Sequence, residues 1–186
     1  MEEELTVDDT DIFKIVSEWA LPNVQKQNEQ CSMGLPDSFF MEYLEQFGEL
    51  QAMLPRQIIH RDPNPGNILF DGDAVSGFID FDLSERNIRL FDPCYCATGV
   101  LSGAEIDGEF EKWLGIAKHI LRGYDAEMPL TAEEKYSAFH VICSIPMICV
   151  AYFNGIDDPD FKRLTQTSRK MLQFIAANRA RLEGMF

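Results

Sequence analysis

The sequence predicts a mostly helical α+β fold that forms a single domain over residues 1–186. Two observations predict this class. Most apolar residues recur at helical spacing between proline and glycine breaks. One segment, ILFDGDAVSGF at 68–78, instead has two β-prone runs joined by Asp-Gly, which is a strong hairpin signal. The apolar content of 46% is enough for a real core and excludes general disorder.

Two helices are predicted before the hairpin. Residues 8–20 place their apolar side chains on one helical face, and Pro22 is expected to end that helix. The polar residues 22–37 are expected to form a connector, which is long enough to contain a short helix. Ser38 is the expected N-cap of a second helix over 39–54.

A short helix is predicted to follow the hairpin. Asp92 is its expected cap and Pro93 its first helical residue, and it continues to about residue 101. A further helix is predicted over 109–122, with Gly123 as its stop.

Two longer helices are predicted at the C-terminal end. The sequence TAEE at 131–134 is a capping box that opens an apolar helix to Phe153, with a kink expected at Pro146. Asp158-Pro159 is expected to open the last helix, which continues to about Leu182.

Composition limits the classes of function. A net charge of −15 argues against non-specific nucleic-acid binding, and it permits a cationic substrate, although ordinary solubility explains it equally well. Five Cys without a CxxC pair predict free thiols, and scattered His argue against zinc. The longest apolar run, VICSIPMICVAYF, is too short for a membrane span, and the acidic N-terminus does not resemble a targeting signal. A cytoplasmic protein without membrane or nucleic-acid partners is therefore expected.

Polar residues flank both ends of the predicted hairpin. Asp62 and Asn67 precede its first strand, and Asp80 follows its second, so a hairpin would bring all three together. A carboxylate that accepts a hydroxyl proton, with an amide and a second carboxylate as Mg²⁺ ligands, is the arrangement needed for phosphoryl transfer from ATP. Ordinary turn chemistry is the alternative, and it does not explain why Asn67 and Asp80 bracket the hairpin.

Three segments, HRDPNPGNILF, GFIDFD and FDPCYCATGVL, give the chain a family resemblance. The chain resembles the aminoglycoside phosphotransferase and choline kinase-like family, which has a protein-kinase-like fold. Only eleven residues separate Asp80 from Asp92, and no APE motif follows, so a small hydroxylated substrate is favoured over a protein substrate. Cys96 stands where the family usually has a second Asp, which puts that structural contact in doubt.

The resemblance assigns a role to each polar residue of these motifs. Asp62 is the implied catalytic base. His60 and Arg61 are implied to hold the catalytic loop in place. Asn67 and Asp80 are implied to bind the cofactor, ATP with its Mg²⁺. The implied metal ligands are Asn67, Asp80 and Asp82.

The resemblance covers the C-terminal lobe of such a kinase. No Gly-rich loop or strand Lys is found upstream of His60, so the lobe that covers ATP is expected to be absent and the isolated chain inactive. Two other functions remain open: a pseudokinase-like binding module, and a Mg²⁺-dependent phosphohydrolase. An apolar face near Leu5 to Phe13 and the rim of the catalytic loop is expected to be uncovered, which predicts self-association.

Overall fold

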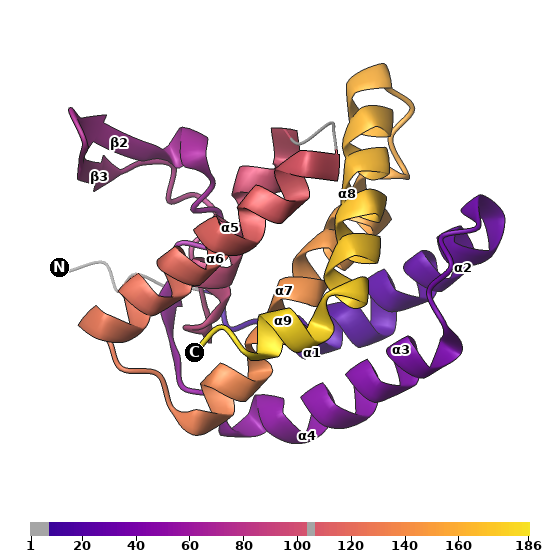
Figure 1. Cartoon of the computed structure of the whole chain (residues 1–186), viewed down its shortest axis with the longest axis horizontal. Coiled ribbons are helices and arrows are strands. Elements are labelled where there is room, and N and C mark those ends of the chain that lie inside the picture. Colours follow the sequence, from indigo (N-terminus) through magenta and orange to yellow (C-terminus); the bar gives the residue numbers. More distant parts are fainter. Residues whose placement is uncertain (1–7, 104–106) are drawn as a thin grey trace, which may run out of the picture.

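The computed structural model describes residues 8–103 and 107–186, and it confirms the predicted class (Figure 1). Its helices pack into one body, and two antiparallel strand pairs flank that body. The helices are α1 Ile12–Ile15, α2 Leu21–Cys31, α3 Asp37–Glu42, α4 Gly48–Leu50, α5 Phe91–Gly99, α6 Asp107–Glu127, α7 Ala132–Phe153, α8 Pro159–Ala177 and α9 Arg179–Glu183. The strands are β1 Arg56–Ile59, β2 Ile68–Asp71, β3 Ala74–Phe78 and β4 Glu85–Ile88. Short 3₁₀ turns lie at Gln51–Met53, Pro65–Asn67 and Val100–Gly103.

The predicted hairpin is confirmed as the pair β2–β3. Asp71 pairs with Ala74, so only Gly72 and Asp73 form the loop. Gly72 has a φ of +61°, a conformation that glycine adopts without a steric penalty. The hairpin extends away from the helices at one end of the molecule (Figure 1).

The prediction that Pro22 ends the first helix is wrong. One helical stretch runs from Ile12 to Cys31, and it includes a π-helical turn over Val16–Ala20, directly before the proline. Within that turn the Leu21 N–H donates to the Val16 carbonyl, five residues back, so the wider turn accommodates the ring without a break. Most of the expected connector is therefore helical. Leu5 lies outside the described residues.

The second helical stretch begins earlier than predicted. It starts at Asp37 with Pro36 in the cap position, so Ser38 is not its N-cap. A π-helical turn over Tyr43–Phe47 interrupts it, and the chain becomes extended at Leu54, before Pro55. The residue before a proline avoids the helical region, which accounts for this end.

A second strand pair was not predicted. β1 and β4 are antiparallel, with Arg56 opposite Ile88 and Ile59 opposite Glu85. Asp9 forms an isolated bridge beside Arg86, and the Asp9 carboxylate accepts from the guanidinium of Arg56 at 2.6 Å. β1 leads directly into residues 60–67, so this pair fixes where the HRD segment begins.

The later helices follow the prediction in part. The capping box is confirmed, because Thr131 and Glu134 bond each other's backbone N–H groups, and α7 ends at Phe153 as predicted. Asp158 caps α8, as predicted. α6 passes through Gly123 and ends at Glu127, so the predicted stop is wrong, and the last helical stretch breaks into α8 and α9.

Helix α7 is the centre of the core and packs along α8. The expectation that no segment could span a membrane is wrong in one respect. By length and composition alone, α7 could cross a membrane. However, 72% of its most apolar window is buried inside the molecule, as in a core helix, and one such helix is weak support for a membrane span.

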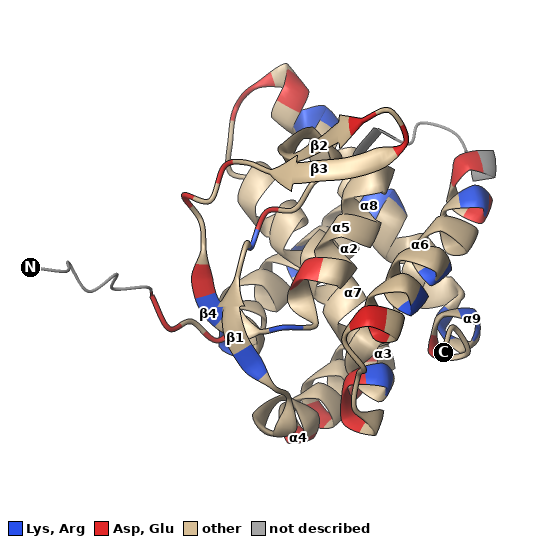
Figure 2. Cartoon of the chain, turned by 90° about the vertical axis from the view of Figure 1, so that its left-hand side faces the viewer, with Lys and Arg blue, Asp and Glu red and all other residues tan. Residues whose placement is uncertain are grey.

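The hairpin and its flanks carry an uncovered apolar surface. Its large apolar side chains that remain exposed include Phe70, Val75, Phe78, Phe81 and Leu83. The strands β2 and β3 carry charge only near their connecting turn, whereas acidic and basic residues are distributed over the helices (Figure 2). The predicted apolar surface is present at the rim of the catalytic loop. At the first helix the prediction is wrong for the described residues, because Ile12 is buried and Phe13 packs against the core.

Candidate active site

The segment HRD at 60–62 is held by one carboxylate on α5. Asp92 accepts the backbone N–H of His60 at 2.8 Å and that of Arg61 at 3.0 Å. The prediction that Asp92 caps α5 is therefore wrong; Leu90 is in the cap position. Burial raises the pKa of Asp92, although the two N–H donors oppose that change. One side chain thus fixes the direction of the loop backbone relative to α5.

Arg61 has an unusual backbone conformation, with a φ of +75°. A non-glycine residue in this region costs about 1–3 kcal/mol and is typical of functional sites. Its guanidinium compensates by donating to Glu85 at 2.5 Å and by lying over the Phe91 ring at 5.6 Å. Glu85 is buried and also accepts from Asn87 at 2.8 Å. The predicted bracing by Arg61 is therefore an ion pair to a buried acid on β4.

His60 links the loop to the end of the hairpin. Its Nε2 bonds the Ile79 carbonyl at 2.9 Å, and its Nδ1 accepts the Asp62 N–H at 3.3 Å. A carbonyl can only accept and an N–H can only donate, so the hydrogen is carried by Nε2. The Ile79 N–H in turn donates to the Asn67 carbonyl at 3.0 Å. Ile79 therefore connects His60 with Asn67, and Asp80 is the next residue in the chain.

Asp62 receives hydrogen bonds from two asparagines. Asn67 Nδ2 donates to the Asp62 backbone carbonyl at 2.9 Å and to its Oδ2 at 3.1 Å. Asn64 Nδ2 donates to Oδ1 at 3.1 Å, and Asn64 Oδ1 accepts the Gly66 N–H at 2.8 Å. The carboxylate is thus oriented by its own loop, as a general base must be. The predicted closeness of Asp62 and Asn67 is confirmed.

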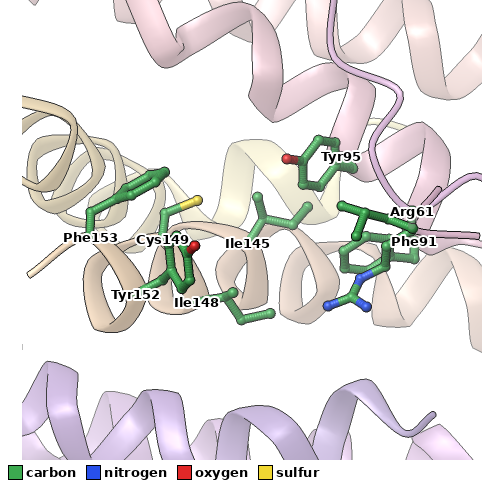
Figure 3. A pocket seen from close by; sticks show the side chains of 9 residues that line it. Arg61, Phe91, Tyr95, Ile145, Ile148, Cys149, Tyr152 and Phe153 are labelled. Atoms are coloured by element: carbon green, nitrogen blue, oxygen red, sulfur yellow. The ribbon is translucent and has the colours of Figure 1, made fainter. Parts of the chain in front are cut away.

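Tyr95 on α5 is a further neighbour of Asp62. Burial raises the pKa of Tyr95, and its hydrogen bond with Asp62 raises the pKa further. Tyr95 also lines two adjoining cavities of about 250 and 230 Å³, between α5, α7 and α8. Figure 3 shows Tyr95, Phe91 and Arg61 on one side of the first cavity and Ile145, Cys149 and Phe153 of α7 on the other. A cavity thus adjoins the oriented carboxylate.

Comparison with known proteins identifies the family. A sequence profile of the phosphotransferase enzyme family matches residues 9–130, which is more than half of the chain. The chain belongs to the phosphotransferase enzyme family. The family resemblance stated from the motifs is therefore confirmed, and with it a small-molecule phosphotransferase lineage.

Curated relatives of this phosphotransferase chain include homoserine kinases from three bacteria. The chain is 34% identical to that of Zymomonas mobilis subsp. mobilis over 55% of this chain and 30% of the relative. The homoserine kinase of Acidiphilium cryptum is 31% identical, over 61% and 35% of the two chains. That of Sinorhizobium medicae is 32% identical, over 60% and 33%. The chain spans about a third of the length of these relatives.

The predicted metal ligands of this family member, Asn67, Asp80 and Asp82, all have side-chain oxygens. Asn67 uses its Nδ2 on Asp62, which leaves its Oδ1 for another partner. Asp80 and Asp82 are exposed, and Asp80 has a φ of +65°. Within residues 8–103 and 107–186, no three His, Cys, Asp or Glu side chains form a metal-binding group. Two carboxylates and an amide oxygen nevertheless suit Mg²⁺, which takes few protein ligands when phosphates and water complete its shell.

Sequence reasoning missed Tyr95 and Glu85 as site residues, and it did not predict that Asp92 anchors the loop. Tyr95, Glu85 and the anchoring role of Asp92 all depend on contacts across more than twenty residues. Asn64 had been explained as a turn residue only. The signal for Asp92 and Tyr95 was present in the FDPCY motif, where the two residues lie three apart and hence on one helical face.

Proposed function

We propose that this chain is the substrate- and Mg²⁺-binding lobe of an ATP-dependent phosphotransferase that phosphorylates a hydroxyl of a small molecule. The observation that carries this proposal is the hydrogen bonding of Asp62, whose carboxylate is oriented by Asn64 and Asn67 beside a cavity. A base held this way is suited to an acceptor hydroxyl. The family match and the homoserine kinase relatives support the same class of reaction.

In the proposed reaction, Asp62 accepts the proton of the acceptor hydroxyl. The hydroxyl oxygen bonds to the terminal phosphorus of ATP, and ADP leaves. Asn67 Oδ1 and the carboxylates of Asp80 and Asp82 would hold Mg²⁺, which supplies positive charge against the phosphates when bound. His60 and Arg61 keep the loop in position, through Ile79 and Glu85 respectively. Because such an enzyme needs ATP, we expect it to act in the cytoplasm.

The experiment measures phosphoryl transfer by the protein as its genome encodes it, because the match covers only 30% and 35% of the length of the first two relatives. ³¹P NMR follows MgATP mixed with small alcohols that differ in charge, with homoserine, which carries an ammonium, and the uncharged pentan-1-ol among them. We expect a phosphomonoester signal that depends on the alcohol. Asp62→Asn should lower kcat by ~10²–10⁴-fold and leave nucleotide affinity nearly unchanged, because the base contacts the acceptor.

The other two functions predict different products. A pseudokinase-like binding module gives no phosphomonoester with or without Asp62. A Mg²⁺-dependent phosphohydrolase releases inorganic phosphate from ATP at a rate that is independent of the alcohol. Near-normal transfer by the Asp62→Asn variant would remove that residue from the role of base.

A further inference from the structure

The cavity beside Asp62 consists of two chambers with a common wall. Both chambers are lined by Tyr95, Ile145, Cys149 and Phe153. Their volumes, about 250 and 230 Å³, are each smaller than the ~300–1,000 Å³ typical of sites for drug-sized ligands. The chambers therefore suit a molecule of modest size.

Asp62 lies close to this common wall. It accepts a hydrogen bond of 3.1 Å from Asn64, which lines the second chamber, and it contributes to the raised pKa of Tyr95 and Cys149 in the common wall. Burial raises the pKa of Cys149 to about 11, while a hydrogen bond with Ser168 opposes this rise. An acceptor molecule in the chambers would thus present its hydroxyl to Asp62 and its remaining atoms to apolar side chains.

The walls of the chambers lack acidic groups, in contrast to the net charge of −15 for the whole chain. In the described part of the chain, no carboxylate lines either chamber. Asp62 approaches the wall, but both of its oxygens already accept from asparagines. When the hydroxyl of an acceptor lies at Asp62, an ammonium at the other end of that acceptor would find no carboxylate in the chamber walls.

Arg61 is the cationic side chain that lines the first chamber. It is paired with buried Glu85 and lies over Phe91, so its charge is already balanced. An ammonium group here would lose water and gain no ion pair in return, because Glu85 is already paired with Arg61.

We propose that these chambers bind an acceptor alcohol that has an apolar body and carries no cationic group. The proposal rests on the phosphotransferase function above and names the class of its acceptor. Polycationic acceptors such as aminoglycosides are excluded by the same reasoning, although the net charge of the chain would permit them. Tyr95, Ile145, Cys149 and Phe153 are the specificity-determining residues of this proposal.

The test uses binding to the ¹⁵N-labelled chain of 186 residues, so it does not require catalysis. Pentan-1-ol and 5-aminopentan-1-ol share the hydroxyl and the carbon chain and differ in one ammonium. We expect pentan-1-ol to shift the amide signals of Tyr95 and Cys149, and the amine to bind about tenfold more weakly because its charge is desolvated without a partner. Equal binding of the two alcohols, or no shift at these amides, would overturn the proposal.

A charge placed at the rim gives a second readout. Tyr152 lines the first chamber and is 58% exposed, so Tyr152→Glu should fold normally and strengthen binding of the amine about fivefold. Tyr136→Glu is the matched control, because it lies on the same helix, is 53% exposed and does not line a chamber. An equal gain in both variants would mean that the amine responds to overall charge and not to the chambers. These binding measurements do not require phosphoryl transfer. A negative result in the transfer assay would therefore contradict the proposed function without deciding the proposed acceptor class, and the reverse also holds.

Discussion

Acid should destabilise this protein through His140, which lies in the middle of α7. The side chain is 1% exposed, and its ring stacks on Phe47 with 5.8 Å between ring centroids and an angle of 6°. Burial, together with the nearby charge of Arg179, lowers the pKa of His140 to about 4. Arg179 is held in place by Glu42, at 2.7 Å. A protonated His140 would therefore be a buried charge beside a second cation.

The sign and the size of the effect follow from linkage. The folded-state pKa, about 4, lies below the ordinary value of 6.5, so the unfolded chain binds more protons between these two pH values. The contribution of His140 is fully present above pH 6.5 and is lost as the pH falls through that window. Integration between pH 7 and pH 5 gives a loss of about 2 kcal/mol in the free energy of unfolding.

The assay is urea unfolding of the wild type and of His140→Phe at pH 7, 6 and 5 in constant ionic strength. Phenylalanine keeps a ring against Phe47 and removes the titrating group. The wild type should lose about 2 kcal/mol relative to this variant between pH 7 and pH 5, because all other titrations cancel in the difference. His119→Gln on α6 controls for the removal of an exposed imidazole and should keep the slope. Parallel curves for wild type and His140→Phe would refute the reasoning.

Three further outcomes are expected. Arg89→Met should destabilise the fold by about 3–5 kcal/mol in urea unfolding, because the fully buried Glu134 loses the guanidinium that now donates two hydrogen bonds of 2.7 Å to it. Adding Glu134→Gln should recover much of that loss, because Gln removes the buried charge and can still accept the Thr131 N–H of the capping box. Calorimetry should find that the 186-residue chain binds MgATP more weakly than micromolar, because its sequence has no Gly-rich phosphate loop, and micromolar affinity would contradict this expectation. Sedimentation should show self-association at high micromolar concentration that Phe70→Ser abolishes, since Phe70 is 60% exposed on the apolar hairpin; a monomeric wild type would contradict it.

Features that depend on neighbouring residues could be predicted from the sequence. The two-residue loop of the hairpin needs only Asp71, Gly72 and the flanking β-prone runs. The capping box needs only Thr131 and Glu134, three residues apart. Both were predicted correctly because the groups that satisfy each other are within a few residues in the chain.

Features that depend on distant partners could not be predicted. The strand β1 has the sequence RQII, which is too short for a periodic signal, and its partner β4 begins 26 residues after Ile59. Pro22 was assigned as a helix end because proline lacks an N–H, and a π-helical turn removed that conflict. Local rules thus predict an element correctly where its backbone hydrogen bonds are made between near neighbours. They fail where a π-helical turn or a distant strand makes those hydrogen bonds.

Asp92 shows the same division within the active site. Its D-P context is typical of a helix cap, and the local rule therefore assigned its oxygens to α5. The fold instead uses both oxygens on the backbone of His60 and Arg61, whose N–H groups would otherwise be unpaired beside a residue of positive φ. A strained loop needs a partner outside itself, because its own residues cannot hold it. The motif around Asp62 can therefore be recognised from the sequence, but the carboxylate that fixes its backbone conformation belongs to Asp92 on α5.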